Sequence, residues 1–249
     1  MTHMKFFSPL ATHRLSPRLP LILIFLSTLL LSSGCATTTS RSATQAPTIV
    51  KSGNVLLMPL DIELSELTAG GLEEPRADWT EAARNYLRMA LDDELAKHNS
   101  SVLRYQEPAD DPSLLHESQQ LQKLYNAVGL SILLHAYNPQ LALPSKKDAF
   151  DWTLGPGVRQ LAADSGADYV MFVYVRDSYA TAGRKLTMFA MAALGIGIQG
   201  GMQVGFVSLV DAHTGDVVWF NRLISTTGDL RTEEPARVAT ATLLTNLPL

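Results

Sequence analysis

The feature that most constrains this chain is a block of eleven uncharged, mostly apolar residues, 21–31, that ends four residues before the only cysteine, Cys35. The twenty residues before the block carry basic but no acidic side chains. A membrane-spanning helix needs roughly 20 apolar residues, whereas the apolar region of a secretory signal has about 7–15. We therefore interpret residues 1–34 as a signal peptide and expect the fold to form from the residues that follow.

The small residues 32–34, Ser-Ser-Gly, stand between the apolar block and Cys35. This arrangement resembles the lipobox of bacterial lipoproteins, in which a small residue precedes an acylated cysteine. The family usually has leucine three residues before the cysteine; here Ser32 holds that place, and Leu31 lies one residue further back. The resemblance implies a lipid on Cys35. Because Ala36 is not the aspartate that favours inner-membrane retention, it also implies the periplasmic face of the outer membrane. The alternative is an ordinary signal peptide, or an uncleaved anchor, with an incidental cysteine.

Composition limits what the rest of the chain can bind. Residues 35–53 are mostly small and polar without periodicity, which predicts a flexible tether, and residues 54–249 form the predicted globular domain. Residues 1–34 hold three basic and no acidic residues, so the remainder has 17 basic and 24 acidic side chains, a net charge of −7. This acidic balance argues against nucleic acid as a partner, because binding to phosphate needs cationic contacts.

The alternation of apolar patterns predicts an α/β fold with a mixed sheet. We expect a single sheet of about five strands with helices packed on it, in the order β-α-β-α-α-β-β-β-α. The expected strands are residues 54–60, 101–105, 167–177, 204–210 and 217–223, and the expected helices are 78–95, 112–137, 157–164 and a terminal helix from 232. Residues 61–77 are expected to be loop. Trp219 should lie in the core, on the same side of its strand as Val217 and opposite Phe220.

No pattern in the chain predicts catalytic, cofactor-binding or metal-binding residues. Residues 195–200 match G-x-G-x-x-G, but a helical segment precedes them and a strand follows, the reverse of the order that a dinucleotide site needs. The histidines after residue 34 show no H-x-x-x-H spacing, and no G-x-S-x-G motif is present. We expect no cofactor and no enzymatic activity. An envelope hydrolase with a site assembled from scattered residues is the alternative.

The segment 186–202 is uncharged and rich in methionine, alanine, glycine and isoleucine, and it follows the basic pair Arg184 and Lys185. Two interpretations compete: a core helix followed by a glycine turn, or a contact surface for membrane or neighbouring subunits. We expect residues 186–194 to be a helix at least half packed on the domain and residues 195–201 to be a flexible link. The candidate contact residues are Leu186, Met188, Phe189, Met191, Leu194, Ile196 and Ile198.

Three further segments, 54–60, 166–173 and 209–219, combine strand and hairpin patterns with the lipobox-like start. Together they resemble a group of bacterial envelope lipoproteins that includes the curli secretion channel lipoprotein and related periplasmic assembly lipoproteins. The resemblance implies an α/β domain similar to the TolB amino-terminal domain. It also implies an accessory or assembly role through contact with other envelope proteins or with copies of itself, and no catalytic residues.

We predict that Cys35 is lipidated and that residues 1–34 are removed. The intact mass of the detergent-extracted protein should correspond to a chain that begins at Cys35 and carries a diacylglycerol-type increment. Cys35→Ser should give a soluble or unprocessed species, because the acceptor sulfur is gone. An unmodified Cys35, or wild-type protein in the soluble periplasm, would contradict the prediction.

Overall fold

The computed structural model of the chain describes residues 37–42, of which only the backbone is considered, and residues 53–98, 101–108, 110–146, 149–163, 165–226 and 228–249. Cys35 and the predicted signal peptide lie outside the described residues, so the processing and lipidation of the chain stay predictions.

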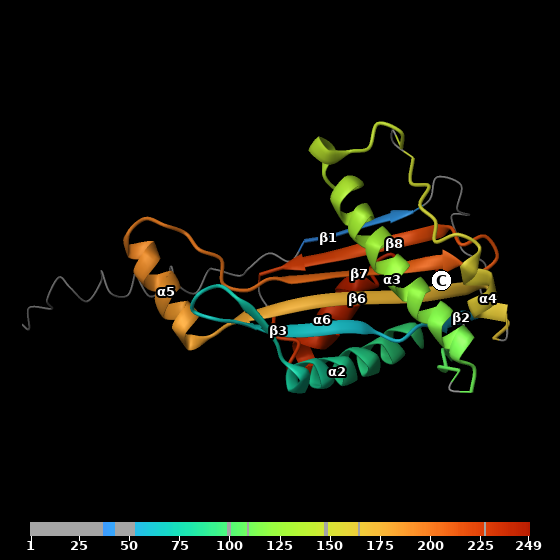
Figure 1. The fold of residues 1–249 in the computed structure, drawn as a ribbon, viewed down its shortest axis with the longest axis horizontal. Coiled ribbons are helices and arrows are strands. Elements are labelled where there is room, and N and C mark those ends of the chain that lie inside the picture. Colours follow the sequence, from blue (N-terminus) through green and yellow to red (C-terminus); the bar gives the residue numbers. More distant parts are fainter. Residues whose placement is uncertain are drawn as a thin grey trace, which may run out of the picture. The chain divides into compact units, whose positions relative to one another are not determined.

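The described strands form one mixed sheet of eight (Figure 1). They are β1 (Thr37–Ser42), β2 (Val55–Leu57), β3 (Asp61–Leu67), β4 (Glu73–Pro75), β5 (Val102–Arg104), β6 (Tyr169–Ala180), β7 (Gln203–Asp211) and β8 (Val217–Ser225). The order across the sheet is β1-β8-β7-β6-β2-β5, with β3 also beside β6 and β4 beyond β3. Strands β6, β7, β8 and β1 are antiparallel neighbours, whereas β2 and β3 run parallel to β6.

A bulge divides β2 from β3. Both strands pair with β6, but the three residues between Leu57 and Asp61 face only two residues of β6. Pro59 lies in this bulge, where its missing N–H costs no ladder hydrogen bond. The expectation of a loop over residues 61–77 is therefore wrong, because the chain resumes as β3 and then pairs with β4. The alternation that builds β3 was present in the sequence, since Ile62 and Leu64 are buried and Glu63 between them is exposed.

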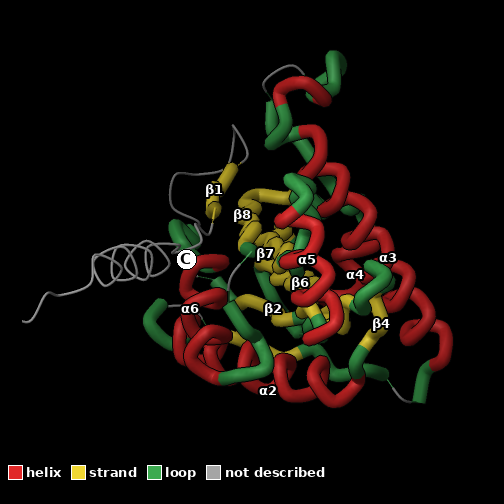
Figure 2. The backbone as a smooth tube through the Cα atoms, turned by 90° about the vertical axis from the view of Figure 1, so that its left-hand side faces the viewer, coloured by secondary structure: helices red, strands yellow, loops and turns green. Residues whose placement is uncertain are grey.

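Helices cover both faces of the sheet and make three layers (Figure 2). The helices are α2 (Ala77–Leu95), α3 (Pro112–His135), α4 (Gly157–Ala163), α5 (Ala182–Ala193) and α6 (Glu233–Leu243), with a short 3₁₀ turn, η1, at Pro139–Leu141. Helices α2 and α6 pack on one face, and α3 and α4 on the other. Helix α5 belongs to neither layer.

Burial on both faces explains why the central strands are continuously apolar. In β2, Val55 and Leu57 face the α2/α6 core while Leu56 faces the α3/α4 core. Tyr125 of α3 fixes the second layer, because its ring stacks on Phe172 with 4.5 Å between centroids and its hydroxyl donates to the Phe172 carbonyl at 3.1 Å. The predicted α/β class with a mixed sheet is confirmed.

The expected number of strands and the expected facing of side chains in β8 need correction. The sheet has more than the expected five strands because β1, β3 and β4 join it. Strand β1 belongs to the predicted flexible tether, and it pairs antiparallel with β8 from Thr37↔Ile224 to Ser42↔Trp219, so this part of the tether is held by backbone hydrogen bonds. A second bulge lies in β8 at Val218, because Val210 pairs with Val217 and Leu209 with Trp219. The bulge turns Val217 and Trp219 to opposite faces of the sheet, whereas they were expected to share one face.

Trp219 should contribute strongly to stability. Only 1% of the residue is exposed, and it packs in the α2/α6 core while Val217 and Phe220 face the α3/α4 core. Trp219→Ala should lower the free energy of unfolding by about 3–5 kcal/mol in chemical denaturation. Trp219→Phe should cost much less, because it keeps an aromatic ring and removes an indole N–H that has no hydrogen-bond partner among the described residues. Equal losses for the two variants would contradict this.

Candidate contact surfaces

Helix α5 and its connections form an arm, residues 181–202, inserted between β6 and β7. Thr181 caps the start of the helix, because its side-chain oxygen accepts from the Arg184 N–H at 2.9 Å. Gly195 ends it in the left-handed region at φ +78°, and the Ile196 N–H donates to the Met191 carbonyl at 2.9 Å. The helix expected over residues 186–194 is thus present, and it begins earlier, at Ala182.

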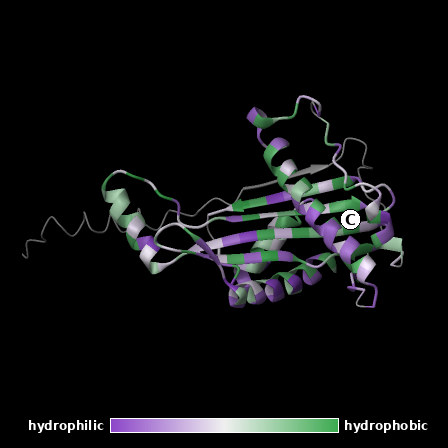
Figure 3. Ribbon diagram, in the orientation of Figure 1, coloured by the Kyte–Doolittle hydropathy of each residue, from purple (hydrophilic) through white to green (hydrophobic). Residues whose placement is uncertain are grey.

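The arm is not packed on the domain as expected. No residue of α5 is buried, because the helix leaves the sheet at its end, where neither helical layer covers it (Figures 1 and 3). The expectation of a half-packed helix, and with it the core-helix interpretation, is wrong. One side of α5 is an exposed apolar stripe at helical spacings of three and four, formed by Leu186, Phe189, Ala190, Ala193 and Leu194.

The opposite side of α5 faces the returning chain. The Arg184 guanidinium donates two hydrogen bonds to the Gln199 carbonyl, at 3.2 and 2.8 Å. Of the candidate contact residues, Met188, Met191 and Ile198 are partly buried. Gly201 lies against β6 so closely that a Cβ there would approach the Ser178 carbonyl oxygen to 1.9 Å. The link over residues 195–201 is irregular, as expected, but its last part is packed tightly against β6.

An additional apolar side chain lies at the same end of the sheet. The turn between β3 and β4 approaches the start of α5, because a Cβ on Gly71 would lie 3.1 Å from the Arg184 guanidinium. Leu72 in this turn was not among the expected contact residues. The four most exposed large apolar side chains of the described residues all belong to this end, and we call them the apolar tip. They are Phe189 at 76%, Leu194 at 74%, Leu72 at 71% and Leu186 at 69% exposed.

A buried carboxyl group stands at the base of the arm. Asp177, 5% exposed, accepts from the Tyr179 hydroxyl at 2.5 Å and from the Gln203 amide at 3.1 Å. The Tyr179 hydroxyl in turn accepts from the Leu230 N–H at 2.7 Å, and the Arg231 guanidinium lies 4.2 Å from the centre of the Tyr179 ring. Burial raises the pKa of Asp177 to about 7, against the lowering effect of its two hydrogen bonds. This network joins β6, β7 and the chain that leads into α6.

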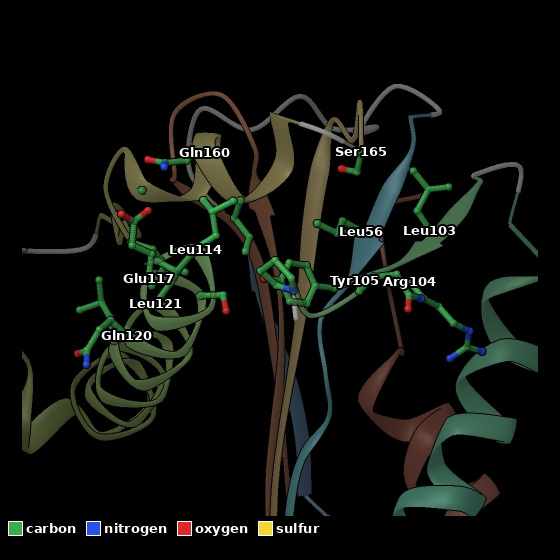
Figure 4. Close-up of a pocket in the computed structure, with 17 residues that line it drawn as sticks. Leu56, Leu103, Arg104, Tyr105, Leu114, Glu117, Gln120, Leu121, Gln160 and Ser165 are labelled. Atoms are coloured by element: carbon green, nitrogen blue, oxygen red, sulfur yellow. The ribbon is translucent and has the colours of Figure 1, made fainter. Parts of the chain in front are cut away.

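A second surface lies at the opposite end of β6. It is a groove of about 960 Å³ between strands β2 and β5 and helices α3 and α4. Leu56 and Leu103 lie on the strand side, and Leu114 and Leu121 lie on the α3 side (Figure 4). The sequence pattern did not indicate this groove, because its walls come from four separate segments, β2, β5, α3 and α4, that only the fold brings together.

The rim of the groove is mixed in charge. Glu117 lines it from α3, and Arg104 lines it from β5 and pairs with Asp92 of α2. Tyr105, partly buried, lies in the lining directly after β5. The arrangement is an apolar floor with a few polar groups around it, which is typical of a binding surface.

The described residues gather no metal-ligand cluster, since no three His, Cys, Asp or Glu side chains among them could share an ion. His98 contacts the Leu249 carbonyl at 3.1 Å and His135 the Leu141 carbonyl at 2.7 Å, so the two rings are used within the fold. The G-x-G-x-x-G segment follows a helix and precedes β7, as expected from the sequence. Among the described helices, none is long and apolar enough to cross a membrane.

Comparison with known proteins gives no family. No protein-family model matches the chain, and no curated protein matches it significantly. Several solved structures are similar at low identity, among them the following three. A PelC dodecamer from Paraburkholderia phytofirmans is 14% identical with a TM-score of 0.39, covering 84% of this chain and 95% of that one. The LpoB C-terminal domain from Salmonella enterica is 16% identical with a TM-score of 0.26, covering 70% and 84%. A DUF4136 family protein from Bacteroides thetaiotaomicron is 11% identical with a TM-score of 0.31, covering 86% and 96%. At these TM-scores the similarity supports no conclusion about function.

The buried carboxyl of Asp177 should make stability depend on pH. Between the ordinary aspartate pKa of 3.8 and about 7, the folded state holds a proton that the unfolded chain has lost. Stability contributed by the neutral form is therefore lost as pH rises through this window. Asp177→Asn keeps an oxygen that can accept both hydrogen bonds and carries no charge. Relative to the parent, its melting temperature should be higher near pH 8 than near pH 5 by a further amount on the order of 2–4 °C.

Asp110, an exposed carboxylate, provides the control. Asp110→Asn should shift the melting temperature equally at the two pH values. If Asp177→Asn also behaves in this way, the carboxyl of Asp177 does not titrate in the folded state over this range.

Proposed function

We propose that this chain is a lipid-anchored accessory or assembly protein on the periplasmic face of the bacterial outer membrane. It acts by contact with other envelope proteins, or with further copies of itself, and not by catalysis. The signal-like start and the lipobox-like Cys35 support the location. The apolar groove between β5 and α3 is the observation that carries the contact role.

The groove lies beside an open edge of the sheet. Strand β5 pairs with β2 on one side, and no described strand pairs with its other side. An extended segment of a partner could add to this edge through backbone hydrogen bonds and place alternate apolar side chains against the leucines of the groove. Polar groups at the rim, such as Glu117 and Arg104, would orient such a segment.

Asp177 and Ser178, a carboxyl and a hydroxyl that could serve hydrolysis, both make hydrogen bonds within the fold. Asp177 is the buried carboxyl with a raised pKa; it accepts one hydrogen bond from Tyr179 within β6 and one from Gln203 of the neighbouring β7. Ser178 beside it hydrogen-bonds with the backbone of Met202, so its hydroxyl serves the strand pairing. These contacts favour a structural role for the pair over a hydrolytic one.

A photo-crosslinking amino acid at Leu124 tests the groove directly. Leu124 lines the groove on α3 and is substantially exposed, so the replacement should be tolerated. Irradiation of cells that produce the full-length chain should give a discrete adduct. Mass spectrometry should identify the adduct as an envelope protein or a second copy of this chain.

Leu130, also exposed on α3 but outside the groove, is the matched control. The adduct should form at Leu124 and not at Leu130, and Leu114→Glu in the groove wall should reduce it. Equal labelling at the two positions, or no adduct at Leu124, would exclude the groove as a protein-contact site.

A further inference from the structure

We propose that the apolar tip of the arm inserts into the membrane interface beside the lipid on Cys35, so that the domain is held to the bilayer at two points. This inference rests on the proposed lipid anchor and names the partner of the arm as a lipid surface. It follows from the register of the sheet, which brings the start of β1 and the base of the arm to the same end of the domain.

The register can be followed across four strands. Thr37 of β1 pairs with Ile224 of β8, Ile224 with Val204 of β7, and Val204 with Arg176 of β6. The arm returns to the sheet beside this row. Its last residue, 202, is followed by Gln203, the first residue of β7, and Val204 comes next. Neighbouring strands lie about 4.8 Å apart, so the start of β1 is on the order of 10 Å from the arm's return to the sheet.

The covalent chain places the anchor close to this row. Cys35 precedes Thr37 by two residues, and two residues span at most about 7 Å. A lipid on Cys35 that enters the bilayer therefore draws this end of the sheet toward the membrane surface. The apolar groove lies at the other end of β6, a strand of twelve residues and about 35 Å, and so faces away from the membrane.

The chemistry of the arm suits an interface. No acidic residue occurs between Asp177 and Asp211, and Lys185 is exposed at the start of α5. The apolar tip presents Leu72, Leu186, Phe189 and Leu194 to the outside. Helix α5 has 12 residues and is about 18 Å long, too short for a hydrocarbon core of about 30 Å. An orientation along the interface, with its apolar stripe among the acyl chains, satisfies these features.

A second copy of the chain is the other candidate to cover the tip. The large apolar groove lies at the opposite end of β6 from the arm. Two copies anchored in one bilayer would both point their tips at the membrane and their grooves away from it. A contact between the tip of one and the groove of the next would then require one copy to be inverted. The lipid surface is therefore favoured.

The test uses the mature chain without its lipid, because the contribution of the arm must be separated from that of the anchor. Residues 35–249 form one compact unit, and Cys35→Ser removes the acceptor sulfur. This chain should float with vesicles of phosphatidylethanolamine and phosphatidylglycerol. Phe189→Glu should reduce its partition into the vesicles by about tenfold or more, because a charge replaces an aromatic ring that would otherwise insert among the lipids. Its melting temperature should stay unchanged, because Phe189 makes no buried contact.

Val238 on α6 supplies the matched control, as an exposed apolar residue away from the arm. Val238→Glu should leave partition within about twofold of the parent. Failure of the unlipidated chain to float, or equal flotation of the parent and Phe189→Glu, would overturn the proposal. A change of size-exclusion mass in Phe189→Glu without any change in flotation would overturn it in favour of a second copy. These outcomes do not depend on whether Cys35 carries a lipid, which the intact mass reports separately.

Discussion

Burial of β6 on both faces is the constraint on which the rest of the structure depends. A strand that is apolar on both sides cannot lie at a surface, so it needs a helical layer above and below it and a strand along each edge. Helices α2 and α6 supply one layer, and α3 and α4 the other. The helical layers do not reach the end of β6, and the arm follows from this uncovered end.

This limit explains why the molecule has two distinct ends. At the start of β6, the helices do not fill the space beside the strands, and an apolar groove remains between α3 and the edge of the sheet. At the end of β6, the chain makes an excursion through α5 before it returns as β7, and a tight network around Asp177 closes the base of that excursion. Strand β1 ties residues 37–42 to this second end through its register with β8. One sheet thereby connects the end that we propose faces the membrane to the end that we propose binds a partner.

Local signals in the sequence predicted much of the fold. Asp111 and Pro112 indicated the start of α3, where the Asp111 carboxylate accepts from two backbone N–H groups. The sequence also predicted β6, from its dense apolar run, and the hairpin of β7 and β8. Strand β3 was missed because Pro59 looked like the end of a strand, whereas it occupies a bulge that lets the strand continue. Composition alone could not show that α5 is exposed, because the same apolar sequence fits a helix covered by another layer and a helix left exposed.

The contact surfaces were only partly predictable for the same reason. Leu186, Phe189 and Leu194 were named from their sequence, but Leu72 joins them only because the turn between β3 and β4 meets the start of α5. The groove and the Asp177 network depend on residues far apart in the chain, which no local pattern brings together. The pairing of distant segments in the fold, and not local composition, therefore forms the groove and the Asp177 network.

The orientation of the lipidated chain on a bilayer tests the account most directly. With Cys35 acylated, Ala190→Cys on the arm or Ala163→Cys on α4 at the groove end would be the only free thiol, and both positions are exposed. An environment-sensitive fluorophore at each position can be quenched by nitroxide-bearing lipids in the same vesicles. If the arm enters the interface, as the account proposes, quenching should be strong at position 190 and absent at position 163, which would lie on the order of 35 Å further from the bilayer. Equal quenching at the two positions, or stronger quenching at position 163, would contradict it.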